Sequence, residues 1–394
     1  MNGGKEKTSF PPFFVCLPGK ICYNITMERK TGQTSWLGEI TEEKKSGLVY
    51  SAAVVASLLL SFVFVIGISA AGYTSAEEYG DENWYLYLSF LLAPVGFAAV
   101  SAGYFLRTRE PVKSVVGVCR PKYYLIAVLL QIGLLSLSQL NTLFISFLER
   151  FGYQPSEVKI PSLEGWGLLG VLLAVAVLPA VFEELVFRGL LLKGMKSFGT
   201  VGAALLCGAL FSLYHQNPVQ TAYQFVCGAA FAFVALRAGS ILPTVLSHFL
   251  NNALIILLAR FGYDDIPAPA LLPVLVCSVL CLIGSVVWLL ADGGVFRRAG
   301  YAGGKTGNGA SAGEQRNVAP GTGAAEKANR KEPECAASAM AGKAHPGGRK
   351  SAELEAGKNE APKADKKGFF LCAAAGIAVC AVVWLSGLLS GFGG

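Results

Sequence analysis

About nine apolar stretches, each long enough to cross a lipid bilayer as a helix, run through this chain of 394 residues. A bilayer core is spanned by roughly 20 helical residues. The stretches lie at residues 48–73, 84–106, 123–148, 166–197, 201–216, 218–237, 241–260, 269–291 and 368–392. Only 15% of the residues are charged, against roughly 25% in soluble domains. The sequence therefore predicts an all-α, multi-spanning transmembrane helical bundle, with about eight core helices plus one C-terminal helix.

Composition divides the chain into four parts. Residues 1–47 are polar, without an uninterrupted apolar run, and we expect a cytoplasmic N-terminal segment with no cleavable signal peptide. Residues 48–291 form the expected transmembrane core. Residues 292–367 are rich in Gly, Ala, Lys and Glu, which predicts a disordered, basic cytoplasmic linker. Residues 368–394 contain no His or carboxylate and predict a last transmembrane helix that serves as an added anchor.

Basic residues predict the orientation of the bundle in the membrane. Lys44 and Lys45 precede the first stretch, the loop at 74–83 has no Lys or Arg, and the loop at 107–122 has several. Because Lys and Arg collect on the cytoplasmic side, we expect a multi-pass protein of the cell membrane with a cytoplasmic N-terminus. Topology also accounts for the net charge of +7 without a nucleic-acid partner. The composition and linker are typical of a bacterial protein.

Ionisable side chains inside apolar spans are costly, so each marks a functional hypothesis. They fall on three stretches, together with polar or aromatic neighbours one helical turn away: Glu183, Glu184 and Arg188; Phe211 and His215; His248 and Asn252. Residues four apart share a helix face, so Glu184 and Arg188 are expected to form an ion pair. Glu183 points about 100° away and is free to face a different cavity.

A carboxylate and two imidazoles in a dry pocket suit the hydrolysis of an amide. Glu183 would take a proton from water as general base, and His215 and His248 would hold that water or a metal. Asn252 would stabilise the oxyanion of the tetrahedral intermediate. Two interpretations of the cofactor stay open: a divalent metal such as zinc bound by Glu183, His215 and His248, or no metal, since the chain has no His-Glu-x-x-His sequence.

Three motifs resemble those of a known family. They are Glu183-Glu184-x-x-x-Arg188, Phe211-x-x-x-His215 and His248-x-x-x-Asn252, in this order within residues 166–255. Together they resemble the CAAX prenyl protease and bacteriocin-processing family (CPBP, or Abi) of intramembrane peptidases, also described as metalloproteases. The resemblance implies an eight-helix core and a cavity facing the cytoplasm. The expected substrate is a membrane-associated protein or peptide, including lipidated ones.

The resemblance also implies roles for the motif residues. Glu183 is the base, and His215, His248 and Asn252 complete the catalytic site. Glu184 and Arg188 support it, and Phe211 is expected to form an apolar wall beside His215.

Two other functions remain as alternatives. A non-catalytic membrane scaffold or bacteriocin-immunity protein would use the same fold without needing the Glu183 carboxylate. A proton-coupled transporter would use Glu and His as a relay, but it predicts inverted repeats of broken helices, and the sequence shows no such symmetry.

Overall fold

The computed structural model describes residues 13–17, 21–25, 40–75, 78–155, 159–262, 268–292 and 364–392. Nearly all of the predicted linker and most of the predicted N-terminal segment lie outside these residues, so both remain predictions. Within the N-terminal segment, strands β1 (Phe13–Leu17) and β2 (Ile21–Ile25) pair antiparallel.

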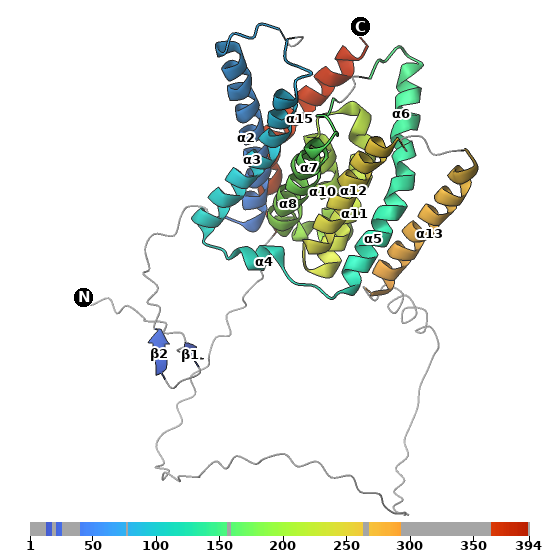
Figure 1. Ribbon diagram of the computed structural model, residues 1–394. Helices are drawn as coiled ribbons and strands as arrows, with labels where there is room; N and C mark the ends of the chain where they lie inside the picture. Colours follow the sequence, from blue (N-terminus) through green and yellow to red (C-terminus); the bar gives the residue numbers. More distant parts are fainter. Residues whose placement is uncertain are drawn as a thin grey trace, which may run out of the picture. The chain divides into compact units, whose positions relative to one another are not determined.

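Eight helices of the described residues are long and apolar enough to cross a membrane. They span Glu42–Ala70 (α2), Asn83–Thr108 (α3), Trp166–Gly194 (α7 to α9), Lys196–Tyr214 (ending in α10, Gly199–Tyr214), Pro218–Ala238 (ending in α11, Thr221–Ala238), Leu242–Phe261 (α12), Leu272–Asp292 (within α13, Ala268–Asp292) and Lys366–Ser390 (α15). Figure 1 shows them as one bundle. The prediction of an all-α, multi-spanning bundle is confirmed for this part of the chain.

The predicted span at 123–148 is an interrupted helix. It consists of α5 (Lys122–Leu135), a 3₁₀ turn at Ser136–Ser138 and α6 (Gln139–Glu149). The Ser136 hydroxyl donates to the Gly133 carbonyl at 2.7 Å, and serines that bond to the backbone in this way bend helices. At Gly133 the backbone of α13 comes so close that an added Cβ would lie 2.6 Å from Leu282. The interruption therefore lies beside a close approach of α5 and α13.

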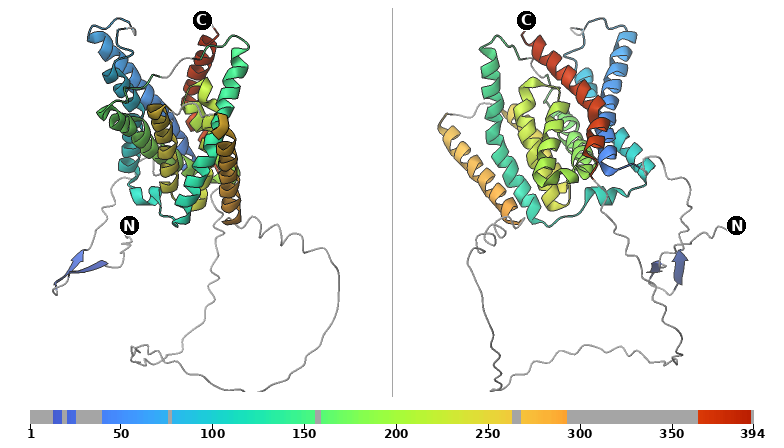
Figure 2. Two further views of the ribbon diagram at one scale, coloured as in Figure 1. Left: turned by 45° about the vertical axis from the view of Figure 1, so that its right-hand side comes forward. Right: turned by 180° about the vertical axis from the view of Figure 1, so that it is seen from behind.

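Helix α15 packs into the bundle beside α2, so its role is larger than the expected anchor. The right-hand view of Figure 2 shows the two helices beside each other. The side chains of Phe369, Ala373 and Cys380 are fully buried, and the Ser51 hydroxyl donates to the Cys372 carbonyl at 2.7 Å. The last described helix thus completes the packing of the first.

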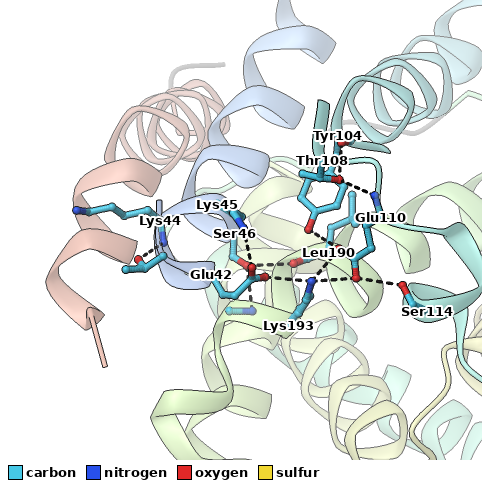
Figure 3. Close-up of polar contacts among 12 residues, drawn as sticks. Glu42, Lys44, Lys45, Ser46, Tyr104, Thr108, Glu110, Ser114, Leu190 and Lys193 are labelled. Carbon is cyan, nitrogen blue, oxygen red and sulfur yellow. Dashed lines mark hydrogen bonds and ion pairs between the residues drawn. The ribbon is translucent and has the colours of Figure 1, made fainter. Parts of the chain in front are cut away.

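A polar network joins the beginning of α2, the end of α3 and α9 (Leu192–Gly194), as Figure 3 shows. Lys193 lies 3.1 Å from Glu42 and 2.8 Å from Glu110. Tyr104 donates to Glu110 at 2.9 Å, and Ser46 donates to the Leu190 carbonyl at 3.0 Å. The network holds three spans in register at one end of the bundle.

The packing of α2 against α15 predicts that alanine substitutions at two glycines of α2 change the stability of the protein in opposite directions. A Cβ at Gly47 would lie 2.4 Å from the Phe369 carbonyl oxygen, whereas a Cβ at Gly67 meets nothing within 4 Å. We expect Gly47→Ala to destabilise the protein by about 1–3 kcal/mol. Gly67→Ala, the matched control, should stabilise it by up to about 1 kcal/mol through helix propensity. Thermal unfolding in detergent measures both, and equal shifts would contradict the packing.

The Lys193 network predicts a pH dependence of stability. Burial by itself would raise the pKa of Glu110, but hydrogen bonds from Lys193 and Tyr104 outweigh it and hold the pKa below its ordinary 4.5. A lowered folded-state pKa contributes stability above pH 4.5 that is lost as the pH falls through the folded value. We therefore expect Glu110→Gln to be less stable than wild type at pH 7, and the gap to shrink below pH 4.5. Glu82→Gln, at an exposed position, is the control. Its stability should differ little from that of wild type at every pH.

Candidate active site

The helix that carries Glu183 and Glu184 is irregular on both sides of them. A π-helical segment at Leu172–Val177 (η2) precedes α8 (Leu178–Glu184), and a second one at Leu185–Leu191 (η3) follows it. Segments of this kind occur mostly as single turns, frequently at functional sites. The two carboxylates therefore lie on a short α-helical piece between two local changes of winding.

Pro179 explains one contact of this helix. Proline has no N–H, so it cannot donate to the carbonyl four residues earlier, which belongs to Val175. The Asn252 side chain of α12 donates to that carbonyl at 2.8 Å instead. Asn252 thus satisfies a backbone oxygen next to the carboxylates and links α12 to η2.

Glu184 and Arg188 form a fully buried ion pair. Their side chains have no exposed surface, and Arg188 Nη1 lies 2.7 Å from Glu184 Oε1. Arg188 also donates to the Gly228 carbonyl of α11 at 3.2 Å and lies over the Phe211 ring, 4.3 Å from its centroid. The ion pair was expected because Glu184 and Arg188 are four residues apart and share a helix face. The guanidinium thereby connects the carboxylate helix to α10 and α11.

His248 lies between the two carboxylates. Its Nδ1 is 3.0 Å from Glu184 Oε1, and its Nε2 is 3.9 Å from Glu183 Oε2. Because an ionised carboxylate only accepts, the Nδ1 carries the hydrogen that Glu184 receives. The Nε2 lone pair of the neutral ring is then directed to the Glu183 side. Glu184 therefore fixes both the orientation and the tautomer of His248.

Glu183 has a buried carboxylate oxygen without a hydrogen bond to the described residues. Its residue is 7% exposed, and its Oε2 is buried without a hydrogen bond in the described structure. The distance of 3.9 Å to His248 Nε2 is too long for a direct hydrogen bond, and a water molecule commonly bridges polar groups at such a separation. A buried polar atom without a hydrogen bond lowers the stability of the folded protein. Native proteins keep such atoms mainly where they serve a function or bind a water molecule.

His215 directly follows the last residue of α10. Its Nδ1 donates to the Phe211 carbonyl at 2.8 Å, because a carbonyl only accepts. Its Nε2 is thus free for the site, and Glu183 and His248 both act on the ring electrostatically. The Phe211 ring lies 4.7 Å from the His215 ring and 6.0 Å from the His248 ring. Phe211 contacts both histidines as the expected apolar wall.

A polar cluster behind Asn252 was not predicted as part of the site. Asn251 donates to the Asn252 side chain at 3.0 Å and accepts hydrogen bonds from Gln131 at 2.8 Å and Tyr223 at 2.7 Å. The sequence offers one signal, since a glutamine inside an apolar span is rare. Tyr223 gave no signal. The cluster positions Asn252 from α5 and α11.

The arrangement does not fit the three-ligand metal site that remained open from the sequence. Among the residues that the structure describes, no three His, Cys, Asp or Glu side chains lie close enough together to hold one ion. The chemistry below is therefore derived from the side chains alone.

The buried contacts predict different stabilities for two neighbouring variants. Glu184→Gln leaves the Arg188 charge buried and uncompensated, so we expect it to destabilise the protein by about 3–5 kcal/mol. Glu183→Gln removes an oxygen that has no hydrogen-bond partner in the described structure, so its melting temperature should stay near that of wild type. Thermal unfolding of the two variants in detergent tests this, and an equal loss in both would contradict the separate environments.

Comparison with known proteins finds one family in this part of the chain. The sequence model of the family described as Type II CAAX prenyl endopeptidase Rce1-like matches residues 165–254. No curated protein and no solved structure matches the chain. The matched segment contains every predicted site residue. Over residues 165–254 the chain thus matches the Rce1-like family of CAAX-type intramembrane peptidases, and the resemblance drawn from its three motifs is confirmed at the family level.

Proposed function

We propose that this protein is an intramembrane endopeptidase that hydrolyses a peptide bond in a membrane-associated protein or peptide. The observation that carries the proposal is the Glu183 carboxylate. Its Oε2 is buried, lacks a hydrogen-bond partner among the described residues and faces His248 Nε2 at 3.9 Å. This is the arrangement expected of a general base that holds a water molecule together with an imidazole.

In the proposed first step, the water is held by Glu183 Oε2 and His248 Nε2. Glu183 takes a proton from it as the water oxygen attacks the carbonyl carbon of the substrate. Because Glu184 accepts from His248 Nδ1, the Nε2 lone pair stays available to accept a hydrogen bond from the same water. The two hydrogens of the water are then used by Glu183 and His248. His215 Nε2, which accepts because its Nδ1 donates to the Phe211 carbonyl, is assigned to an N–H of the substrate.

The tetrahedral intermediate needs a hydrogen-bond donor for its oxyanion. The Asn252 amide nitrogen carries two hydrogens and uses one on the Val175 carbonyl. Its second hydrogen is assigned to the oxyanion. Collapse of the intermediate then breaks the C–N bond, and Glu183 returns its proton to the leaving nitrogen. The carboxylate is thereby regenerated as base.

The substrate is proposed from the family match. A CAAX-type peptidase acts near the C-terminus of a lipidated protein, so a farnesylated C-terminal peptide is the first probe. The same peptide without the lipid separates a lipid-dependent enzyme from one that processes ordinary peptides, as in bacteriocin maturation. The alternative of a non-catalytic scaffold predicts that neither peptide is cleaved.

The test compares full-length wild type with Glu183→Gln in detergent, using a quenched farnesylated peptide. We expect the variant to lose at least about 100-fold in kcat/KM, the usual size of a general-base contribution. Its binding of the peptide, followed by fluorescence anisotropy, should persist. Glu149→Gln, an exposed carboxylate of α6, is the control and should match wild type. Cleavage retained in Glu183→Gln would refute the assigned base.

A further inference from the structure

A basic pocket lies at one end of the bundle, away from the catalytic site. It has a volume of about 680 Å³ and is lined by Arg120, Tyr123, Arg237 and Asp292 among others. Tyr123 lies in the first turn of α5, Arg237 in the last turn of α11, and Asp292 ends α13. Because the membrane-spanning helices α11 and α13 end here, beside the beginning of the shorter apolar helix α5, we place the pocket at the depth of the lipid headgroups.

The charges of the pocket favour an anion. Asp292 is already engaged by Lys122, which forms an ion pair with it, and by the Tyr123 hydroxyl. No salt bridge of the described residues involves Arg120 or Arg237. The buried Nε of Arg237 also has no hydrogen-bond partner. Two guanidinium groups are therefore available, and this group binds phosphate oxygens in a bidentate manner.

A separate apolar groove lies between α5 and α13, two of the helices that line this pocket. It has a volume of about 650 Å³ and is lined by Leu129 of α5 and by Val276, Leu280 and Gly284 of α13. Leu129 lies about 9 Å along α5 from Tyr123, and Gly284 about 12 Å along α13 from Asp292. A phospholipid with its phosphate at Arg120 and Arg237 would place its acyl chain over this distance and into the groove.

We infer that Arg120 and Arg237, with the α5–α13 groove, form a binding site for an anionic phospholipid. The arginines hold the phosphate, and the groove holds one acyl chain. Basic pockets between transmembrane helices recognise anionic headgroups in this way. The site is separate from the proposed catalytic carboxylate and does not depend on peptidase activity.

The test measures thermal unfolding of the full-length protein in detergent. The additions are phosphatidylglycerol, phosphatidylcholine or inorganic phosphate. We expect phosphatidylglycerol to raise the melting temperature more than the other two. In the double variant Arg120→Gln/Arg237→Gln, the affinity for phosphatidylglycerol should fall about tenfold. Lys113→Gln/Lys196→Gln removes the same charge from exposed positions outside the pocket and should keep the wild-type response. Arg120→Gln alone, at an exposed position, is used if the double variant does not fold.

Gly284→Leu tests the groove independently. A Cβ there meets nothing within 4 Å, and Gly284 lines the groove, so a leucine is expected to occupy part of it. We expect the variant to be at least as stable as wild type without lipid, yet less stabilised by phosphatidylglycerol.

Three results would overturn the inference: equal stabilisation by phosphatidylcholine, full stabilisation by inorganic phosphate alone, or an unchanged lipid response in both the arginine and the Gly284 variants.

Discussion

The buried ion pair of Glu184 and Arg188 is the constraint on which the rest of the site depends. Removing two charges from water costs several kcal/mol per ion unless each finds excellent partners. Here Arg188 bonds to Glu184 and to the Gly228 carbonyl, and Glu184 also accepts from His248. These contacts join the carboxylate helix to α11 and α12. The position of His248 relative to Glu183 follows from them.

The backbone on both sides of α8 is π-helical rather than α-helical. A membrane environment permits such irregular segments only under one condition. Backbone groups in a bilayer must be satisfied within the protein, so an irregular segment survives only where neighbours supply partners. Asn252 does so at the Val175 carbonyl, and Asn251 holds Asn252 with help from Gln131. The residue expected to bind an oxyanion thus also stabilises the irregular turn, which links local winding to the proposed chemistry.

The ends of the helices have a different physical character from their centres. Inside the bundle, aromatic rings surround few charges, whereas at one end Lys193 gathers two carboxylates and Arg120 and Arg237 line a basic pocket. Charges at the ends are close to water and headgroups and cost less than charges at the centre. Catalytic and lipid-binding chemistry can therefore occupy separate levels of one bundle.

The sequence by itself determined the membrane class, nearly every span and the residues proposed for the site, because hydropathy and a spacing of four residues are local properties. It also predicted the pairing of Glu184 with Arg188. Only the tertiary structure decided that His248 bonds to Glu184, that α5 and α6 separate at residues 136–138, and that α15 packs on α2. These features depend on close approaches between distant segments, such as Gly133 with Leu282 and Gly47 with Phe369, which no local pattern encodes.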